Sequence, residues 1–420
     1  MKEPRARRTK THATTWLAIA ALSSCGGEPP ADEPAAFAPE AVRPFTISVP
    51  DAAVVDLRDR LERTRLPDQI PGTAWDYGTN RAYLEELLAY WRDDFDWREQ
   101  ERRLNGFDQF KTEIDGVDVH FVHERSSNPE AVPLLLIHGW PGSFVEFAGL
   151  VGPLTDPASH GGSASDAFHV VVPSLPGFGF SGKPAESGFS PERMADMLAA
   201  LMERLGYDHY GVQGGDWGGI IGRSLAGNHG DAVIGFHTNF VLGGPPAGAD
   251  PNEGVTASEL EMRQDRAEAF AEGSAYQEIQ GTKPQSLGVG LNDSPAGLAA
   301  WIVEKFHGWS DNDGDVESAF TRDELLTNIT LYWVTETITS SARIYYEFRH
   351  APASRPVRYV AVPTAGAIFP KEIYFTPRAW AEASYNIVRW TVMPRGGHFA
   401  ALEEPDLLLE DVRAFFSGLR

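Results

Sequence analysis

The sequence of 420 residues contains one cysteine, Cys25. A single cysteine cannot form a disulfide within the chain, and it cannot build a cysteine-based zinc site. Cys25 also lies far from every segment with a catalytic pattern, so a cysteine nucleophile is not expected. Any role for Cys25 must therefore be one that suits the N-terminal end of the chain.

Basic residues are also scarce, with 36 Lys and Arg against 59 Asp and Glu and a net charge of −23 at pH 7. Such a surplus of negative charge repels a phosphate backbone, so nucleic acid is not an expected partner. The apolar run near the N-terminus covers only residues 14–22, which is too short to span a bilayer. An apolar content of 42% is ordinary for a globular protein, and the length allows one large domain or two to three smaller ones.

Residues 1–24 have the features of a lipoprotein-type signal peptide. The basic front consists of Lys2, Arg5, Arg7, Arg8 and Lys10. After the apolar run, residues 22–25 read LSSC, which is similar to a bacterial lipobox, whose cysteine receives lipid and becomes the mature N-terminus. A plain secretory signal is the main alternative, and Arg7-Arg8 is a weak sign of twin-arginine export. We therefore expect an exported bacterial lipoprotein, anchored through Cys25 and periplasmic or on the cell surface.

Residues 26–44 are rich in Pro, Ala, Glu and Gly, which predicts a flexible tether, and folded structure is expected from Phe45. Helices are predicted at residues 51–61, 81–95 and 194–205, and strands at residues 110–114, 117–123, 134–137, 170–172 and 207–213. Asp51 is the expected N-cap of the first helix, and Asp115-Gly116 suits a hairpin turn. This pattern is typical of an α/β fold with a mostly parallel sheet.

Beyond residue 240 the pattern changes. Residues 256–345 are mainly helical in pattern, strands return at 357–362 and 387–392, and a helix at 407–416 ends the chain. A helical block between two groups of strands predicts a cap over the sheet. The expected divisions are the signal peptide 1–24, the lipidated cysteine and linker 25–44, an N-terminal region 45–125, a first core part 126–242, the cap 243–355 and a second core part 356–420.

A glycine-rich turn follows the strand expected at 207–213. Residues 214–218 read GGDWG, which fits a nucleophile elbow with Asp216 at its centre and Gly214 and Gly218 beside it. Small residues are needed there because strand and helix backbones approach closely. A carboxylate is already ionised at neutral pH and can attack an sp3 carbon to form an ester, so the motif favours alkyl transfer over acyl transfer. The alternative is an ordinary glycine-rich loop with a solvated aspartate.

Residues 138–142 read HGWPG and follow the strand expected at 134–137. Loops at the carboxyl ends of parallel strands form the ligand site of an α/β sheet. In such a fold, one oxyanion-hole amide comes from this loop and one from the residue after the nucleophile, which gives Trp140 and Trp217. A simple Gly-Pro turn is the alternative.

His398 follows two glycines after the last expected strand, a position that suits a general base. Eleven other histidines are present, and only this position distinguishes His398. An acid that orients the base would lie between nucleophile and histidine in the chain. Glu372 fits best, although spacing alone leaves Glu347, Glu382 or a solvated role for Glu372 open.

Taken together, these motifs resemble those of the microsomal-type epoxide hydrolases of the α/β-hydrolase superfamily. The resemblance covers nearly all of residues 45–420. It is carried by residues 90–92, 95–97 and 110–112, by the motifs at 138–143 and 214–218, by the lid segments 276–284 and 340–345, and by 369–372 and 395–400. The resemblance implies an α/β-hydrolase fold with an inserted helical cap.

The resemblance also implies two acid catalysts in the cap, Tyr276 and Tyr345, and identifies Glu372 as the charge-relay acid. Phenols with a pKa near 10 can donate a proton to the alkoxide that forms when an epoxide opens. Taken singly, a tyrosine in a helical cap is more often a core residue, and the adjacent Tyr346 leaves the second position ambiguous.

The implied activity is conversion of an epoxide to a vicinal diol through an aspartyl ester, with no metal or organic cofactor. The expected partners are a small hydrophobic epoxide and water, with membrane contact only through the N-terminal lipid. A haloalkane dehalogenase, which shares the Asp and His pair, is one rival, and a non-catalytic lipoprotein that binds hydrophobic ligands is another. The mammalian members of the family resemble membrane proteins with an N-terminal helical anchor, whereas this chain has a lipobox-like leader.

Overall fold

The computed structural model describes residues 38, 40–246, 248, 250–351 and 359–420. The predicted signal peptide, Cys25 and most of the tether lie outside the described residues. The remainder belongs to one compact unit, Pro39–Arg420. No helix in the described part of the chain is both long enough and apolar enough to cross a membrane.

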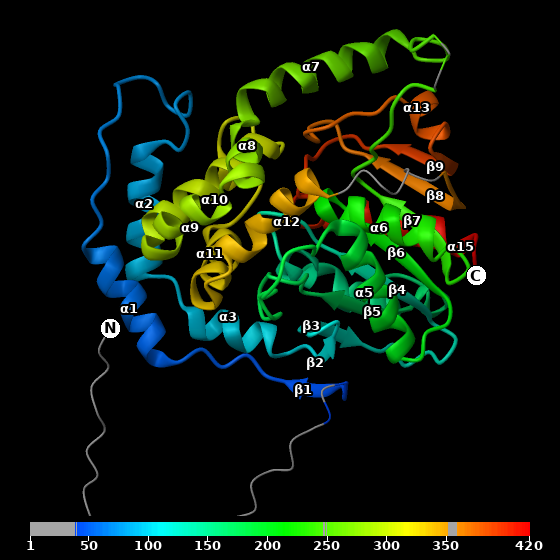
Figure 1. Cartoon of the computed structure of the whole chain (residues 1–420), viewed down its shortest axis with the longest axis horizontal. Coiled ribbons are helices and arrows are strands. Elements are labelled where there is room, and N and C mark those ends of the chain that lie inside the picture. The colour runs from blue at the N-terminus through cyan, green and yellow to red at the C-terminus, as the bar shows by residue number, and fades with distance from the viewer. Residues whose placement is uncertain (1–37, 39, 247, 249, 352–358) are drawn as a thin grey trace, which may run out of the picture. The chain divides into compact units, whose positions relative to one another are not determined.

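A nine-stranded sheet runs through this unit in the order β1-β2-β3-β5-β4-β6-β7-β8-β9 (Figure 1). The strands are β1 (Arg43–Phe45), β2 (Gln109–Ile114), β3 (Val117–Glu124), β4 (Val132–Ile137), β5 (Phe168–Pro173), β6 (Tyr210–Gly214), β7 (Val233–Thr238), β8 (Val360–Ile368) and β9 (Tyr385–Val392). Strands β1, β2, β3 and β5 pair antiparallel, and every pair from β5 to β9 is parallel. The predicted mostly parallel sheet is therefore confirmed.

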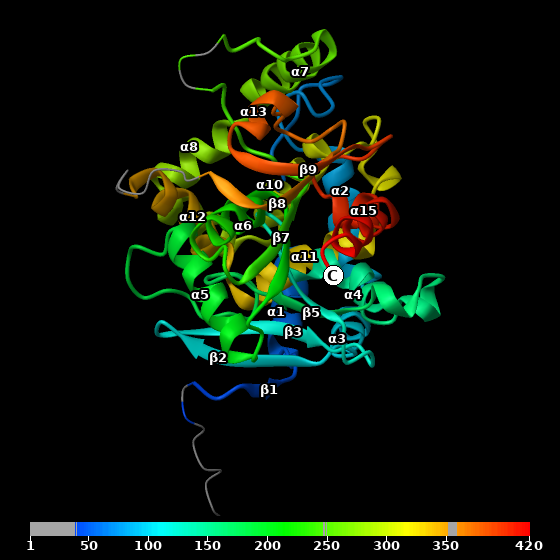
Figure 2. The ribbon, with the colours of Figure 1, turned by 90° about the vertical axis from the view of Figure 1, so that its right-hand side faces the viewer.

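The central strands are apolar along their length because helices cover both faces of the sheet. Residues 134–137 of β4 and 170–172 of β5 are fully buried. Helices α5 (Pro191–Arg204) and α6 (Asp216–Asn228) lie on one face, and α4 (Ala148–Thr155) and α15 (Pro405–Ser417) lie on the other (Figure 2). Continuous apolar runs of this kind are expected in a parallel sheet that is buried on two sides.

The hairpin between β2 and β3 turns at Asp115 and Gly116, whose φ angles are 53° and 74°. Positive φ at both central residues is the geometry of a type I′ turn, so the predicted hairpin is confirmed. The predicted cap of the first helix is wrong. Pro50 occupies the N-cap position and Asp51 is the first helical residue, where it pairs with Arg98 instead.

Between residue 40 and β2 lie three helices: α1 (Asp51–Glu62), α2 (Arg81–Asp93) and α3 (Trp97–Leu104). The third was missed in the sequence. Its N-cap Asp96 accepts hydrogen bonds from the amides of residues 98 and 99. It buries Trp97 and Leu104, but its short length and high charge hide the helical period.

In the described residues between β7 and β8 there are six α-helices: α7 (Ala257–Gly273), α8 (Ala275–Thr282), α9 (Pro284–Asp293), α10 (Pro295–Trp309), α11 (Arg322–Thr335) and α12 (Ile338–His350). Figure 1 shows α8 to α11 grouped beside the sheet, with α1 and α2 along their outer side. Five hydrogen-bonded pairs join the N-terminal helices and their connecting loop to this block: Arg60 with Asp293, Thr79 with Ala300, Glu86 with Arg322, Tyr90 with Asp323 and Trp91 with Thr330. The N-terminal region is thus packed against the helical block.

The remaining elements are short. They are α13 (Arg378–Glu382) and α14 (Ala400–Glu403), with 3-10 turns at Phe144–Phe147, Pro157–His160, Ala164–Asp166 and Val316–Ser318. The strand predicted from residue 357 is described only from residue 359 on, where β8 begins at Val360 and continues to Ile368. This extension pairs with β7 and carries the chain to the carboxyl ends of the parallel strands.

A buried carboxylate ties the last helix to the sheet. Asp411 of α15 accepts hydrogen bonds from His237 at 3.0 Å, from Arg389 at 2.6 and 2.8 Å and from Thr391 at 2.6 Å. Burial alone would raise the pKa of Asp411, but these bonds outweigh it and hold the pKa well below its usual range. Asp411 is therefore charged and fully paired in the folded protein.

Candidate active site

Asp216 occupies a sharp turn between the end of β6 and the start of α6. Its φ angle is 48°, a left-handed conformation that is uncommon for any residue other than glycine. A Cβ atom on Gly218 would lie 1.9 Å from the carbonyl oxygen of Ile137, and one on Gly214 would lie 2.4 Å from the carbonyl oxygen of Gly218. The two glycines are therefore required by the close approach of the backbones, as the elbow motif predicts.

The loop after β4 reaches this turn. The backbone amide of Trp140 donates a hydrogen bond to Asp216 Oδ1 at 2.7 Å. The carboxylate also sits directly against Gly139, since a Cβ there would lie 2.2 Å from the same oxygen. Trp217, the other predicted amide donor, is the next residue of α6, and its indole packs against Tyr345 with ring centroids 4.7 Å apart.

His398 lies between two carboxylates. Its Nε2 is 3.4 Å from Asp216 Oδ2, and its Nδ1 is 2.5 Å from Glu372 Oε1. All three come from the carboxyl ends of strands, on the turns after β6, β8 and β9. Glu347 instead accepts a hydrogen bond from the backbone amide of Gly188. Glu382 lies on the surface and accepts a hydrogen bond from Arg378 of its own helix, so neither glutamate binds His398.

The charges around His398 control its protonation. Burial alone would lower its pKa, but the carboxylates of Glu372 and Asp216 raise the pKa well above its usual range. The ring is consequently an imidazolium while Asp216 is charged. Its protonation depends on the charge state of the adjacent carboxylate.

A half-buried glutamate, Glu403, holds the loop that carries His398. Glu403 accepts hydrogen bonds from the amides of Asp311, Gly397 and Phe399 at 2.8 to 2.9 Å. Burial raises the pKa of Glu403 to about 7, although these bonds act in the opposite direction. No motif marks Glu403 in the sequence, because its three partners are backbone groups that come together only in the fold.

A cavity of about 670 Å³ opens on one side of Asp216. Tyr276 and Tyr345 line it together with Asp216, and the two tyrosine rings lie 5.6 Å apart. Much of the remaining surface is apolar and comes from Trp217, Ile220, Phe240, Phe270, Phe348 and Ile373. The cavity therefore brings the Asp216 carboxylate and the Tyr276 and Tyr345 phenols together among largely apolar walls; its lining also includes Arg223, Glu278, Arg349 and Tyr374.

The two adjacent tyrosines of α12 point in different directions. Tyr345 is 6% exposed and lines the cavity, whereas Tyr346 is 37% exposed and stacks on His350. Of the two, the structure brings Tyr345 to Asp216. Burial raises the pKa of Tyr276 and that of Tyr345, and the nearby charge of Asp216 adds to both shifts. Both phenols are therefore protonated at neutral pH.

Lys305 is a buried cation beside this site that the sequence did not reveal. It lies in α10, is 5% exposed and forms an ion pair with Glu304. Its Nζ lies 4.8 Å from the ring centroid of Tyr276 and within 5.8 Å of those of Trp301 and Trp309. A cation over an aromatic face is attracted to it, so Lys305 helps to hold the Tyr276 ring. Nothing in the helical pattern of α10 distinguishes this lysine from a surface one.

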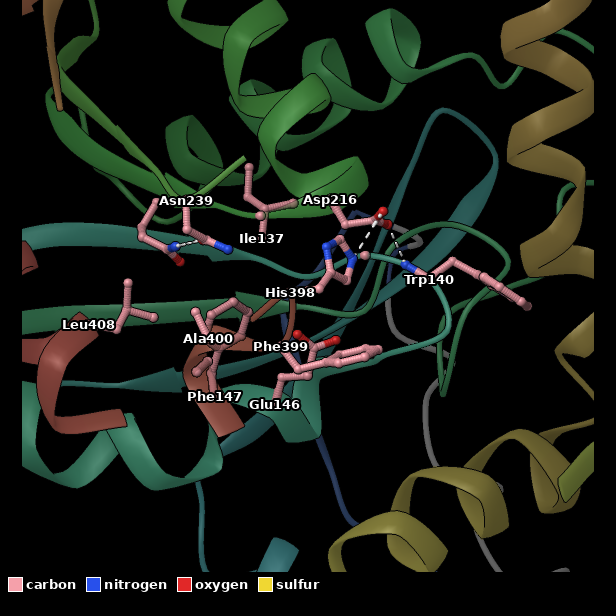
Figure 3. Close-up of a pocket in the computed structure, with 14 residues that line it drawn as sticks. Ile137, Trp140, Glu146, Phe147, Asp216, Asn239, His398, Phe399, Ala400 and Leu408 are labelled. Carbon is pink, nitrogen blue, oxygen red and sulfur yellow. Dashed lines mark hydrogen bonds and ion pairs between the residues drawn. The ribbon is translucent and has the colours of Figure 1, made fainter. Parts of the chain in front are cut away.

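A second and much smaller cavity, of about 20 Å³, also borders Asp216, and Figure 3 shows the residues that line it. His398, Glu146, Gln213 and Asn239 contribute its polar lining. Asp216 is the residue that both cavities share. Asp216 therefore borders both a large, mostly apolar chamber that holds Tyr276 and Tyr345 and a small one that holds the histidine.

Known proteins resemble this chain both in sequence and in architecture. A family model described as "Epoxide hydrolase N terminus" matches residues 42–147, and one described as "alpha/beta hydrolase fold" matches residues 132–242. The chain is 46% identical over 385 residues to a Stigmatella aurantiaca protein named "Putative epoxide hydrolase", covering 90% of this chain and 86% of that protein. It is 40% identical over 420 residues to Epoxide hydrolase 1 of Sus scrofa, covering 93% and 92%.

Among solved structures, juvenile hormone epoxide hydrolase from the silkworm Bombyx mori is 34% identical, with a TM-score of 0.84 over 91% of this chain and 95% of that one. The likeness thus extends over the sheet, the helical block and the N-terminal region together.

Proposed function

Because the chain belongs to the family of microsomal-type epoxide hydrolases, has their α/β-hydrolase fold and is an epoxide hydrolase, we propose that Asp216 is its nucleophile and His398 its base. The observation that carries the proposal is the position of Asp216 between the two cavities, with His398 Nε2 3.4 Å from one of its oxygens. The large cavity can hold the substrate that the nucleophile attacks, and the small one places the base beside the ester that must then be hydrolysed.

In the first step, Asp216 attacks an epoxide carbon in the large cavity. The Trp140 amide binds Oδ1, so Oδ2 forms the new C–O bond while the ring C–O bond breaks towards the ring oxygen. That oxygen takes a proton from Tyr276 or Tyr345, which leaves a tyrosinate. Two phenols near one carboxylate suit this step because they bind the oxygen as its charge develops.

Ester formation changes the protonation of His398. The charge of Asp216 is one cause of the raised histidine pKa, so loss of that charge in the ester lowers it. The imidazolium then gives up its proton, which restores the tyrosine hydroxyl. The neutral ring that results is held by Glu372 and is able to act as a base.

In the second step, water adds to Cγ of the ester and gives a proton to His398 Nε2. The Trp140 amide stabilises the oxyanion on Oδ1, and we assign the Trp217 amide the same role. When the bond between Cγ and Oδ2 breaks, Oδ2 leaves as an oxygen of the diol and takes the proton from His398, while the water oxygen stays on Asp216. The Asp216 carboxyl then loses its own proton to His398, so the resting state returns and the sum is epoxide plus water giving diol.

We also propose that the substrate is a hydrophobic epoxide and that the enzyme is anchored in a bacterial membrane by lipid on Cys25. The apolar walls of the large cavity support the first part, and the basic front, the short apolar run and the LSSC sequence support the second. Anchoring would bring the cavity close to epoxides that partition into the bilayer. The test is fractionation of the full-length chain and of Cys25→Ser, with the mass of the mature N-terminal peptide. A soluble wild type without lipid mass would remove the anchor and leave the catalytic assignment intact.

The catalytic assignment is tested with Asp216→Asn and styrene oxide. An amide oxygen is a far weaker nucleophile than a carboxylate, so diol formation should be abolished while the far-UV spectrum and thermal unfolding stay unchanged. Asp208→Asn, an exposed aspartate before β6, is the matched control and should keep full activity. Full turnover by freshly purified Asp216→Asn, with its mass confirmed to exclude deamidation, would refute the assignment.

A further inference from the structure

The small cavity is close to the size of a single water molecule. About 20 Å³ accessible to a water-sized sphere is enough for one water, provided that polar groups surround it. Gln213 supplies one such group: its Nε2 donates to Asn239 at 3.1 Å, while its buried Oε1 has no hydrogen-bond partner in the described protein. The cavity thus offers polar partners to a water molecule, and it adjoins Asp216.

Glu146 reaches this cavity because Gly142, four residues earlier in the chain, has no side chain. The residue lies in the 3-10 turn Phe144–Phe147, and its Oε1 lies only 1.3 Å from where a Cβ of Gly142 would be. Gly142 therefore leaves the space that the carboxyl group fills. Figure 3 shows the Glu146 carboxyl pointing toward the ring of His398, with Asp216 beyond it.

The charge state of Glu146 agrees with this placement. Burial raises its pKa to about 8, and the negative charge of Asp216 adds to the shift while His398 opposes it. At neutral pH the side chain is consequently a neutral carboxylic acid that can both donate and accept a hydrogen bond. The mechanism above gives no role to this group, although it lines the same cavity as the nucleophile and the base.

We propose that Glu146 is a further catalytic residue, which binds the water molecule that hydrolyses the Asp216 ester. The proposal rests on the function proposed above, since it requires the ester. The water oxygen forms a bond to Cγ of Asp216, one of its protons passes to Nε2 of His398, and the other stays hydrogen-bonded to Glu146. Glu146 gains and loses no proton in the cycle, so the balance of the reaction is unchanged.

This arrangement separates the two steps in space. Ester formation takes place in the large cavity, which Glu146 does not line, and hydrolysis begins in the small one. A substitution at Glu146 should therefore slow the second step and leave the first nearly unchanged. A residue with a purely structural role would affect the two steps together, because both use Asp216.

The test is rapid-quench mass spectrometry with styrene oxide, which measures the ester on Asp216 as it forms and decays. In Glu146→Gln, which keeps the shape against Gly142, the hydrolysis rate constant should fall about 10-fold or more, and the ester should accumulate. The rate constant of ester formation should stay within about twofold of wild type. Glu146→Ala should slow hydrolysis further.

The matched control is Glu101→Gln, a buried glutamate that binds the amide of Val49 and Arg98 far from both cavities. It should leave both rate constants within about twofold of wild type. The inference is overturned if hydrolysis is unchanged in both Glu146 variants, or if both steps slow by the same factor in a folded Glu146→Gln. If wild type forms no ester on Asp216, the proposed function itself fails, which is a different result.

Discussion

Gly218→Ala should damage both the fold and the reaction. The added Cβ would lie 1.9 Å from the carbonyl oxygen of Ile137, whereas ordinary contact begins at 3.4 Å, so the backbones must separate by about 1.5 Å. Both sides of the contact are main chain, at the end of β4 and in the first turn of α6, and no side chain can move aside. We expect a loss of about 3 kcal/mol, at the upper end of the usual cost of overpacking.

That loss translates into a modest change in melting temperature. With an unfolding entropy of about 2.1 cal/mol/K per residue, a unit of roughly 380 residues should lose about 4 °C. The activity should fall more, because Ile137 leads to Trp140, whose amide lies 2.7 Å from Asp216 Oδ1. Loss of one oxyanion donor lowers kcat by roughly 10²-fold or more.

Gly227→Ala is the control for this experiment because it lies in the same helix with no atom within 4 Å of the added Cβ. A methyl group there should stabilise the protein by about 0.5–1 kcal/mol and leave the rate unchanged. Thermal unfolding and initial rates on styrene oxide measure both effects. If Gly218→Ala melts and turns over like wild type, the close approach of β4 and α6 and its link to Trp140 are refuted.

Three further results are expected. Tyr345→Phe should slow ester formation by roughly 10²–10⁴-fold in rapid-quench measurements, whereas Tyr346→Phe should stay near wild type; the reverse result would place the donor one residue later. Glu372→Gln removes a charge that raises the pKa of His398, so the acid limb of the pH profile for ester hydrolysis should move to lower pH, and an unmoved limb would contradict the pairing. Asp411→Asn should cost about 3 kcal/mol in urea unfolding at pH 7. Since the folded pKa of Asp411 is depressed, its contribution is present above about pH 3.9, and the difference from wild type should shrink as the pH falls below that value; a difference that persists in acid would contradict this account.

Local sequence patterns were enough to predict the buried strands and the tight hairpin turn. The buried runs of β4 and β5 and the turn at Asp115-Gly116 could be read directly, because sheet burial and positive φ impose strict residue choices. The N-cap of α1 was read wrongly because Asp51 suits the first helical turn as well as the cap. Helix α3 was missed because eight mostly charged residues show no clear period.

The site was predictable where chain order or a motif restricted the choice. Asp216 and His398 stand out by their positions after strands, but spacing alone could not separate Glu372 from Glu347, and the choice between Tyr345 and Tyr346 depended on which face of α12 meets the cavity. Glu146, Lys305 and Glu403 carry no local signal. Their partners are a glycine, an aromatic ring and three amides that only the folded chain brings to them.

Because the backbone of Asp216 is left-handed, the residue that suits the proposed reaction at this position differs from the residue that would make the fold most stable. A non-glycine residue in that region costs of order 1–3 kcal/mol, and the rest of the elbow must compensate for it. Glycine would adopt the same conformation without the cost but would have no carboxylate. On the proposed mechanism, a screen of random variants for heat resistance alone would enrich inactive proteins changed at position 216. Any effort to make this enzyme more robust must therefore select for turnover in every round.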